Sequence, residues 1–432
     1  MSTFLDTRDP GFETAFARLM QTRVAAGASV DTVVRDIIAD VRSRGLEAVL
    51  ELTHRFDHLE LTPDTVVVGP AEIEAAIATV PHAKREALEL AAERIRAYHV
   101  RQLPEDTQWT DDVGARLGWR WTPVRAAGLY VPGGLASYPS SVLMNAIPAK
   151  VAGVDEIIIC APTPHGQINP LVLLAANLCQ VDRVFRVGGA QAIAAMAYGS
   201  DPIPAVDKIT GPGNAYVAAA KRQVFGTVGI DMIAGPSEVL IIADGDNNPD
   251  WIALDLMAQA EHDETAQAIL ITSDAKFARA VGEAVEARLQ TLERREIAGA
   301  SWRDHGAIIV VESLAEAPAL ADRIAAEHLE ILTVDAEALA ARVRNAGAIF
   351  LGAYTPEAIG DYVGGPNHVL PTDGSARFSS GLSVMDFLKR TTLSAVSPDT
   401  LRVIGPAAAT LARSEGLEAH ALSVECRLER LN

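Results

Sequence analysis

Short apolar runs alternate with amphipathic helical patterns from about Trp119 onward, and this alternation constrains the fold more than any other feature of the chain. Apolar runs bounded by Gly and Pro are typical of buried strands, and apolar residues at a helical period indicate helices. The predicted strands are Glu156–Cys160, Arg183–Val187, Lys208–Thr210, Glu238–Ala243, Ala268–Thr272, Ile308–Val311, Ile331–Val334 and Ala348–Leu351. The predicted helices between them are Gln191–Tyr198, Ala215–Val224, Trp251–Ala260, Lys276–Leu289 and Leu314–Ala326. Strands and helices in this order favour parallel sheets with right-handed crossovers.

The strands fall into two clusters, before and after roughly Gly235. At 432 residues the chain is also longer than one ordinary core can fill. We therefore expect an α/β protein with two incomplete, Rossmann-like parallel-sheet domains and helical extensions at both ends. The expected segments are a mainly helical region over 1–118 that packs partly on the second α/β domain, one α/β domain over 119–236, another over 237–384 and a helical tail over 385–432.

Charge and cysteine content argue against several classes of protein. With 56 acidic against 37 basic residues, the net charge of −19 repels phosphate backbones, so we expect no nucleic-acid partner. Cys160, Cys179 and Cys426 are too few and too scattered for a disulfide framework, which favours a reducing cytoplasm. The N-terminal segment MSTFLDTRDP lacks the apolar core of a secretory signal, and no apolar run is long enough to span a membrane.

Two strand-to-helix turns have the features of a phosphate or ribose site. A Gly-Gly turn leads into a helix near Gln191, and a Gly-Pro-Gly turn leads into a second helix at Asn214. Each turn places free helix N–H groups at the carboxyl edge of a strand, where open α/β sheets bind ligands. Neither turn matches the G-x-G-x-x-G fingerprint or a P-loop, so tight turns without a ligand are the alternative.

Two segments carry candidate metal ligands. Gln259 and His262 are three residues apart on a predicted helix, which puts both on one face, and Asp255 lies on the same stripe. His with an amide and carboxylates suits zinc or manganese, although a cap or a solvated surface residue is the alternative. Asp361 and His368 lie in the Gly- and Pro-rich segment 360–384, which we expect to be a long ordered loop.

Further polar residues indicate proton transfer or ligand contact. Glu327 and His328 lie where a helix gives way to a strand, so both side chains can face one cleft and divide proton-transfer duties. Glu415 and His420, near the C-terminus, could equally belong to an exposed amphipathic helix. Ser237 follows a Gly-Pro turn, where it could bind a ligand or cap the turn.

Taken together, these segments resemble the histidinol dehydrogenase family. The similarity runs in order from about Trp119 to the C-terminus and leaves out the N-terminal hundred residues, which match only in helical character. The motifs that carry it are AAGLYVPGG, GGAQAIAAMAYG, GPGNAYVAAAKRQV, AGPSEVLIIAD, AQAEHDE, AEHLEI, GPNHVLPT, ARFSSGLSV and SEGLEAHA.

The resemblance implies the oxidation of L-histidinol to L-histidine through L-histidinaldehyde with two NAD. It implies NAD contacts at Tyr130, Gln191 and Asn214, and a catalytic acid–base pair at Glu327 and His328. The implied ligands of one zinc ion per subunit are Gln259, His262, Asp361 and His420. The implied substrate contacts are Ser237, Gln259, His262, His328, Asp361, His368, Glu415 and His420. The resemblance also implies a cytoplasmic homodimer in which the C-terminal tail reaches the partner's site, so that Glu415 and His420 serve the neighbouring subunit.

The paired residues suit this chemistry. An imidazole near neutral pKa can take the hydroxyl proton, which suits His328, and a carboxylate can activate the water that hydrates the aldehyde, which suits Glu327. Three alternatives stay open: a zinc- and NAD-dependent dehydrogenase of the same superfamily with another small hydroxylated substrate, a non-catalytic metal- or nucleotide-binding protein, and a thiol-dependent aldehyde dehydrogenase. For the last, Cys160 ends a very apolar run, where packing in the core is the better interpretation.

Overall fold

The computed structural model describes residues 2–21, 30–132, 138–233 and 235–431. It has two compact units, and the larger one contains the parallel sheets. The larger unit comprises Met1–Gln102 and Arg125–Phe387, and the smaller one comprises Leu103–Val124 and Leu388–Asn432. The sequence-based prediction of an α/β fold with two parallel sheets is confirmed.

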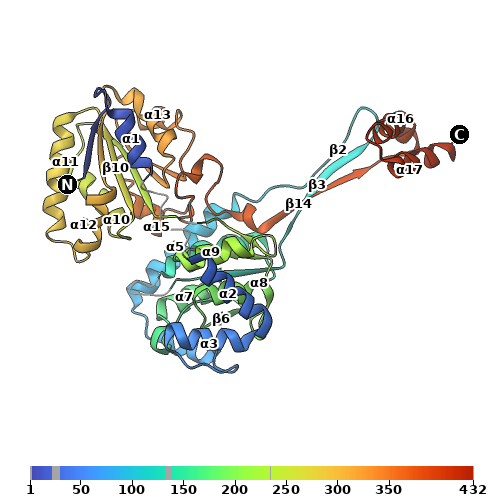
Figure 1. Cartoon of the computed structure of the whole chain (residues 1–432), viewed down its shortest axis with the longest axis horizontal. Coiled ribbons are helices and arrows are strands. Elements are labelled where there is room, and N and C mark those ends of the chain that lie inside the picture. The colour runs from blue at the N-terminus through green and yellow to red at the C-terminus, as the bar shows by residue number, and fades with distance from the viewer. Residues whose placement is uncertain (1, 22–29, 133–137, 234, 432) are drawn as a thin grey trace. The chain divides into compact units, whose positions relative to one another are not determined.

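The first sheet of the larger unit has five parallel strands in the order β6-β5-β4-β7-β8. They are β4 (Ala126–Tyr130), β5 (Glu156–Cys160), β6 (Arg183–Phe185), β7 (Lys208–Thr210) and β8 (Gly229–Ile230). The accompanying helices are α2 (Val30–Arg44), α3 (Leu46–Asp57), α4 (Pro70–Ala78), α5 (His82–Val100), α6 (Pro139–Ala152), α7 (Pro170–Leu178), α8 (Gly189–Tyr198) and α9 (Ala215–Val224). The N-terminal helices α2 and α3 pack on α8, and α2 also packs on α9 (Figure 1), so they share one apolar core with this sheet.

The second sheet has six parallel strands in the order β1-β11-β10-β9-β12-β13. They are β1 (Thr3–Asp6), β9 (Glu238–Ala243), β10 (Gln267–Thr272), β11 (Ala307–Val310), β12 (His328–Leu332) and β13 (Ala348–Leu351). Its helices are α1 (Phe12–Gln21), α10 (Pro249–Ala260), α11 (Ala275–Leu289), α12 (Arg295–His305), α13 (Ala317–Ile324), α14 (Ala336–Ala340) and α15 (Glu357–Tyr362). Apolar cores lie on both faces, which is why β9 to β12 read as continuous apolar runs and not as alternating ones.

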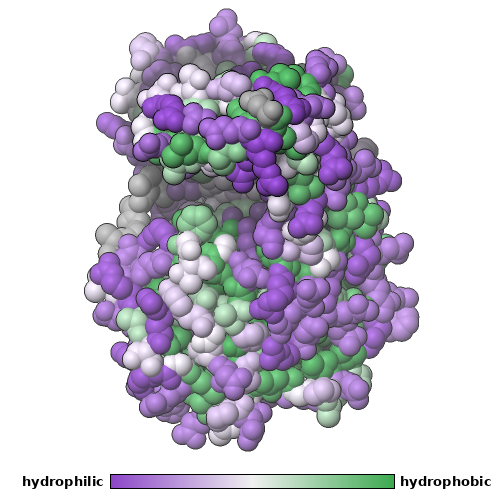
Figure 2. All heavy atoms as spheres, turned by 90° about the vertical axis from the view of Figure 1, so that its right-hand side faces the viewer, coloured by the Kyte–Doolittle hydropathy of each residue, from purple (hydrophilic) through white to green (hydrophobic). Residues whose placement is uncertain are grey.

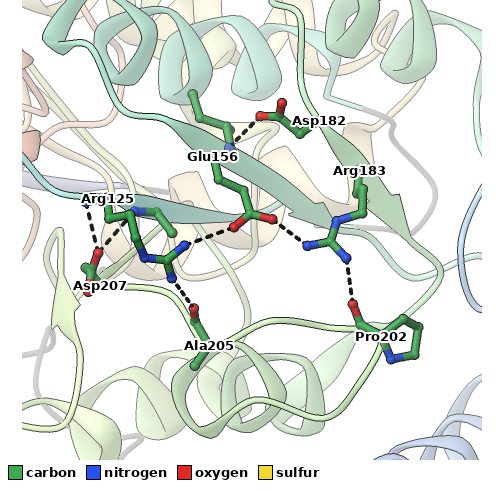
Figure 3. Close-up of polar contacts among 9 residues, drawn as sticks. Arg125, Glu156, Asp182, Arg183, Pro202, Ala205 and Asp207 are labelled. Carbon is green, nitrogen blue, oxygen red and sulfur yellow. Dashed lines mark hydrogen bonds and ion pairs between the residues drawn. The ribbon is translucent and has the colours of Figure 1, made fainter.

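Charged side chains fix the amino ends of strands in the first sheet (Figure 3). Glu156, at the start of β5, lies between two arginines: its Oε2 accepts a hydrogen bond from Arg125 at 3.3 Å, and its Oε1 accepts one from Arg183. Asp207 accepts two backbone N–H bonds of 3.0 Å at the start of β4, and Asp182 accepts one of 2.8 Å from β5. The opposite, carboxyl edge of these strands is the edge at which open α/β sheets bind ligands.

The smaller unit combines a three-stranded antiparallel sheet with a helical pair. The sheet has the order β14-β3-β2, with β2 (Thr107–Thr110), β3 (Arg116–Pro123) and β14 (Leu388–Ala395), and α16 (Pro398–Ser414) packs on α17 (Glu418–Glu429). The boundary expected at residue 118 therefore falls inside β3, and the tail expected to be helical over 385–432 includes the strand β14. Pairing with β3, far away in the sequence, makes this polar segment a strand.

All the predicted strands overlap observed ones, with shifts of a few residues at their ends. The largest shift is at β12, which begins at His328 and not at Ile331. The strand β4 was not predicted, because its AAGLY segment lacks the β-branched residues that are typical of strands. The prediction of a loop over 360–384 was wrong at its start: Asp361 lies on α15, and 3₁₀ turns cover Ser375–Arg377 and Val384–Phe387.

Among the residues that the structure describes, none of the helices combines the length and apolar character needed to cross a membrane.

Candidate active site

A cavity of about 480 Å³ in the larger unit collects most of the predicted site residues. Those that line it are Asn214, Ser237, Gln259, His262, Glu327, His328, Asp361 and His368. They come from the turn before α9, the amino ends of β9 and β12, the carboxyl end of α10, helix α15 and the loop that follows it. These segments are far apart in the sequence, so the cavity exists only in the folded chain.

Sheet pairing explains why the acid–base candidates meet the α10 residues. His328 is the first residue of β12 and pairs with Val239, at the start of the neighbouring strand β9. The helix α10 follows β9 and runs back to the amino edge of the sheet, where it ends just after Gln259. The second sheet therefore offers its amino edge to the cavity, whereas Asn214 follows the carboxyl end of β7 in the first sheet.

His328 is held with one ring nitrogen free. Its Nδ1 lies 3.1 Å from the carbonyl oxygen of Glu238, which can only accept, so we assign the ring proton to Nδ1. Nε2 has no hydrogen-bond partner and lies 3.6 Å from Asp361 Oδ1. Burial lowers the pKa of His328, but the carboxylates of Glu357, Glu327 and Asp361 raise that pKa well above its ordinary value. Nε2 is thus the ring atom through which His328 can exchange a proton inside the cavity.

Glu327 lies beside this imidazole in an apolar setting. Its Oε2 accepts a hydrogen bond of 3.0 Å from the backbone N–H of Glu238 and is 3.7 Å from Nδ1 of His328. Burial raises the pKa of Glu327 to about 7, and the His328 charge opposes this shift. A carboxyl group with such a pKa can exchange protons near neutral pH.

Three side chains form a donor set for a metal ion. Ligand atoms of His262, Glu357 and Asp361 all lie within 4.8 Å of one another. Gln259 adjoins them: with its amide nitrogen turned toward acceptors, the nitrogen lies 3.1 Å from Glu357 Oε1 and 3.3 Å from the Glu238 carbonyl oxygen. In this orientation the amide oxygen, the atom by which Gln ligates metals, points away from Glu357 Oε1 and the Glu238 carbonyl oxygen.

The charge balance around this donor set also fits a cation. Glu327, Glu330 and Glu357 are all buried, and Glu330 Oε2 has no hydrogen-bond partner. Buried carboxylates are costly without a positive partner. Burial raises the pKa of Glu330 to about 8 and that of Asp255 to about 6, and each of these acids lies close enough to disfavour the other's charge. The combination of imidazole, carboxylate and amide donors suits zinc or a similar divalent ion.

Glu357 and Glu330 are the site residues that the sequence analysis missed. A signal for Glu357 was available, because it precedes Asp361 by four residues and both lie on α15, where that spacing shares a face. Glu330 follows His328 by two residues on β12 and accepts a 2.6 Å hydrogen bond from the backbone N–H of Glu357. In the sequence Glu330 is a single acid inside an apolar run, and no local pattern distinguishes it from an exposed residue.

The predicted NAD residues line a second cavity of about 930 Å³, which is large enough for a dinucleotide. Tyr130 ends β4, and its hydroxyl accepts a 3.1 Å hydrogen bond from Gly189 N at the start of α8. Gln191 lies two residues further along α8, with a buried Oε1 that lacks a hydrogen-bond partner. Asn214 caps α9 through its side-chain oxygen and lines both cavities. The two cavities therefore adjoin at Asn214.

Glu415 and His420 lie in the smaller unit. Glu415 ends α16, His420 lies on the first turn of α17, and both are exposed.

A family model described as histidinol dehydrogenase matches residues 20–428 of the chain. The chain belongs to the histidinol dehydrogenase family. A histidinol dehydrogenase of Ruegeria pomeroyi is 70% identical over 432 residues, and one of Cereibacter sphaeroides is 69% identical; both alignments cover all of each protein. The crystal structure of a histidinol dehydrogenase from Elizabethkingia anophelis has a TM-score of 0.95 at 36% identity and covers 100% of this chain and 99% of that one. The resemblance drawn from the motifs is confirmed.

The thiols of this family member have no catalytic features in the structure. Cys160 and Cys179 are buried, and burial raises the pKa of both thiols, to about 12 for Cys179. Cys426 is exposed on α17, in the smaller unit. Neither buried thiol lines one of the two cavities, so a thiol-dependent aldehyde dehydrogenase has no support from the described residues.

Proposed function

We propose that this enzyme oxidises L-histidinol to L-histidine through L-histidinaldehyde, with two NAD per turnover and one zinc ion per subunit. The observation that carries the proposal is the free Nε2 of His328 beside Glu327 and the donor set, in a cavity that shares Asn214 with a dinucleotide-sized one. In this proposal residues 119–236 bind NAD, residues 237–384 bind zinc and substrate, and residues 385–432 form the dimer contact.

His328 serves the alcohol step. Its Nε2 takes the hydroxyl proton of histidinol, and the hydride of the same carbon passes to NAD, which gives the aldehyde and NADH. Proton removal and hydride loss together take two electrons from the carbon, so the aldehyde must be oxidised once more to reach the acid. The hydrogen bond from Nδ1 to the Glu238 carbonyl keeps Nε2 directed toward the cavity.

Glu327 serves the aldehyde step. Its carboxylate takes a proton from water as the water oxygen adds to the aldehyde carbon, and the carbonyl oxygen takes the proton that His328 gained in the alcohol step. The product is a gem-diol whose carbon still carries one hydrogen. That hydrogen leaves as hydride to a second NAD, and loss of the hydroxyl proton gives the carboxylic acid. Ser237 and His368 line the cavity, where we propose that they contact the substrate.

Gln259, His262 and Asp361 would hold the zinc ion, with His420 as the fourth ligand and Glu357 beside them. When bound, zinc would position the substrate through its amine and imidazole nitrogens. The residues of the chain carry the proton transfers.

We propose a homodimer in which Glu415 and His420 complete the partner's site. In support, the α16–α17 pair exposes Val403 at 63%, Leu411 at 64% and Leu422 at 48%. Figure 2 faces these helices and shows apolar residues (green) among hydrophilic ones (purple) on the surface. Exposed apolar side chains gathered on so small a unit suit burial against another chain. The free thiols are compatible with a cytoplasmic location.

The first test is the stoichiometry of the reaction. Purified enzyme with L-histidinol should form two NADH per histidine, lose turnover after treatment with a chelator and regain it with zinc. No turnover by folded, zinc-loaded enzyme would overturn the proposed substrate, and other amino alcohols and diols would be assayed next.

The second test separates the two catalytic residues. His328→Asn should lose the oxidation of histidinol by about 100-fold or more, because general base catalysis contributes that much. Glu327→Gln should retain part of the alcohol step but lose oxidation of supplied histidinaldehyde. Equal loss of both half-reactions in the two variants would contradict this division of roles.

A further inference from the structure

Asp57, the last residue of α3, lies on the wall of the larger cavity together with Tyr130, Gln191 and Asn214. Its Oδ2 is buried and has no hydrogen-bond partner. Burial raises the pKa of this carboxyl, because few groups nearby replace the water that it has lost. A buried acceptor of this kind gains stability when a ligand brings a hydroxyl donor.

Gln191 gives a second, independent sign that a polar ligand belongs here. Its side chain is only 1% exposed, yet it lines the same cavity and its Oε1 also lacks a partner. Two acceptors without hydrogen-bond partners thus belong to residues that line one cavity. A ligand with several hydroxyl groups can donate hydrogen bonds to both.

The direction of the cofactor follows from the two cavities. The nicotinamide must reach the substrate cavity, which the larger cavity meets at Asn214. The pyrophosphate suits the amino ends of α8 and α9, which are the positive ends of the helix dipoles. The adenosine half then lies against the wall formed by α2 and α3, which includes Asp57.

Charge on this wall discriminates between dinucleotides. Its described acids are Asp36, Asp40 and Asp57, and Arg44 neutralises Asp40 through bonds of 2.7 and 2.6 Å. The described lining residues include one cation, Arg55, which is exposed and lies over the ring of Phe56. A doubly charged phosphate next to Asp57 would meet repulsion and find few donors.

We infer that Asp57 binds the adenosine ribose hydroxyls and excludes a 2′-phosphate, so that it makes the enzyme select NAD over NADP. This inference rests on the proposed function, because it takes a nicotinamide dinucleotide as the occupant of the cavity. In the usual dinucleotide fold the acid that binds the ribose follows the Gly-rich turn by some twenty residues. Here an N-terminal helix that precedes the sheet supplies it, outside any fingerprint that the sequence displays.

The test compares kcat/KM for NAD and for NADP in the zinc-loaded enzyme with L-histidinol. Asp57→Asn removes the charge but keeps the shape. It should lower kcat/KM for NAD by roughly 10-fold to 100-fold, the value of one hydrogen bond to a charged group. It should also shrink the NAD-to-NADP ratio by at least about 10-fold, because the repulsion is lost. Asp57→Glu should keep the rejection of NADP, and Asp64→Asn, the same charge change at an exposed position that does not line the cavity, should change neither value.

Two results would overturn the inference while the proposed function stands: a wild-type enzyme that uses NADP as well as NAD, or an unchanged ratio in Asp57→Asn. If wild type forms no reduced dinucleotide from histidinol at all, the proposed function fails instead. Fluorescence titrations with NADH and NADPH give the same ratio without turnover, and they decide the matter if Asp57→Asn is poorly active. If that variant does not fold, Asp57→Glu decides it, since loss of NADP rejection there would contradict the role of the charge.

Discussion

At the scale of single residues, the candidate site depends on hydrogen-bonding groups that orient its side chains. The Glu238 backbone is the clearest case: its carbonyl accepts from His328 and its N–H donates to Glu327, so one residue at the start of β9 holds both members of the proposed acid–base pair. Glu357 has the corresponding place beside Gln259, because its Oε1 accepts from the Gln259 amide and so decides which end of the amide faces the donor set.

Glu357→Gln should therefore weaken zinc binding. A Gln at this position can turn its own NH₂ toward Gln259, which removes the reason for the amide orientation. Loss of such an orienting partner lowers metal affinity by roughly 10-fold to 100-fold. Competition against a chromogenic chelator measures the affinity without any assay of turnover.

The exposed Glu286→Gln on α11 provides a matched charge control. Unchanged zinc affinity in Glu357→Gln would contradict the orienting role. A complete loss of zinc stoichiometry would instead make Glu357 a ligand of the ion itself.

At the scale of elements, the turn between β7 and α9 is fixed by a buried ion pair. Gly211 N donates to Asp231 Oδ2 at 2.8 Å, and Lys221 Nζ donates to Gly211 O at 2.9 Å. The two charged side chains also pair with each other and are 3% and 1% exposed. Gly211 is required because its φ is +116° and a Cβ there would lie 2.1 Å from the carbonyl oxygen of Tyr130. The turn therefore holds its position, and Asn214 with it, at the junction of the two cavities.

Lys221→Met should destabilise the enzyme by about 3 kcal/mol or more, because it leaves the Asp231 charge buried without a partner. It should also raise the KM for NAD, since the turn loses the bond to Gly211 O. In Lys221→Met/Asp231→Asn the buried charge is gone, while Asn can still accept from Gly211 N, so this double variant should be more stable than the single one. Urea unfolding midpoints give the comparison, and a double variant no more stable than Lys221→Met would contradict the explanation.

At the scale of the whole molecule, the site draws on opposite edges of the two parallel sheets in the larger unit. The first sheet contributes its carboxyl edge through Tyr130 and Asn214, as open α/β sheets usually do. The second contributes its amino edge through Glu327 and His328. The proposed cofactor site and the proposed substrate site thus lie on separate sheets, and Glu415 and His420 lie in a unit that contains neither sheet.

Mixing two inactive variants tests whether Glu415 and His420 act across a dimer. His262→Ala and His420→Ala should each be inactive as homodimers, whereas a mixed dimer has one site in which both histidines are intact. Random exchange of subunits should then restore about one quarter of wild-type activity, because half of the dimers are mixed and half of their sites are complete. Mixed dimers that form, as shown by native mass spectrometry, but stay inactive would contradict shared sites.

Local sequence patterns were sufficient to predict the α/β class, the two parallel sheets and the family. Strands buried on both faces are continuous apolar runs, and a turn such as the one before Asn214 is a local pattern, so both can be recognised from neighbours in the chain. The candidate residues Gln259, His262 and Asp361 also belong to segments that the sequence analysis singled out. The structure places them around one cavity.

The surroundings of these residues could not be predicted from local patterns, because they form only in the folded chain. Whether Glu330 is a buried acid, or Asp57 an open acceptor in a cavity, depends on elements far away in the sequence. The same holds for β14, which is a strand because β3 pairs with it, and for Asp361, whose helix packs where a Gly-rich sequence indicates a loop. Burial and pairing are set by contacts across the fold, and a local sequence pattern does not contain them.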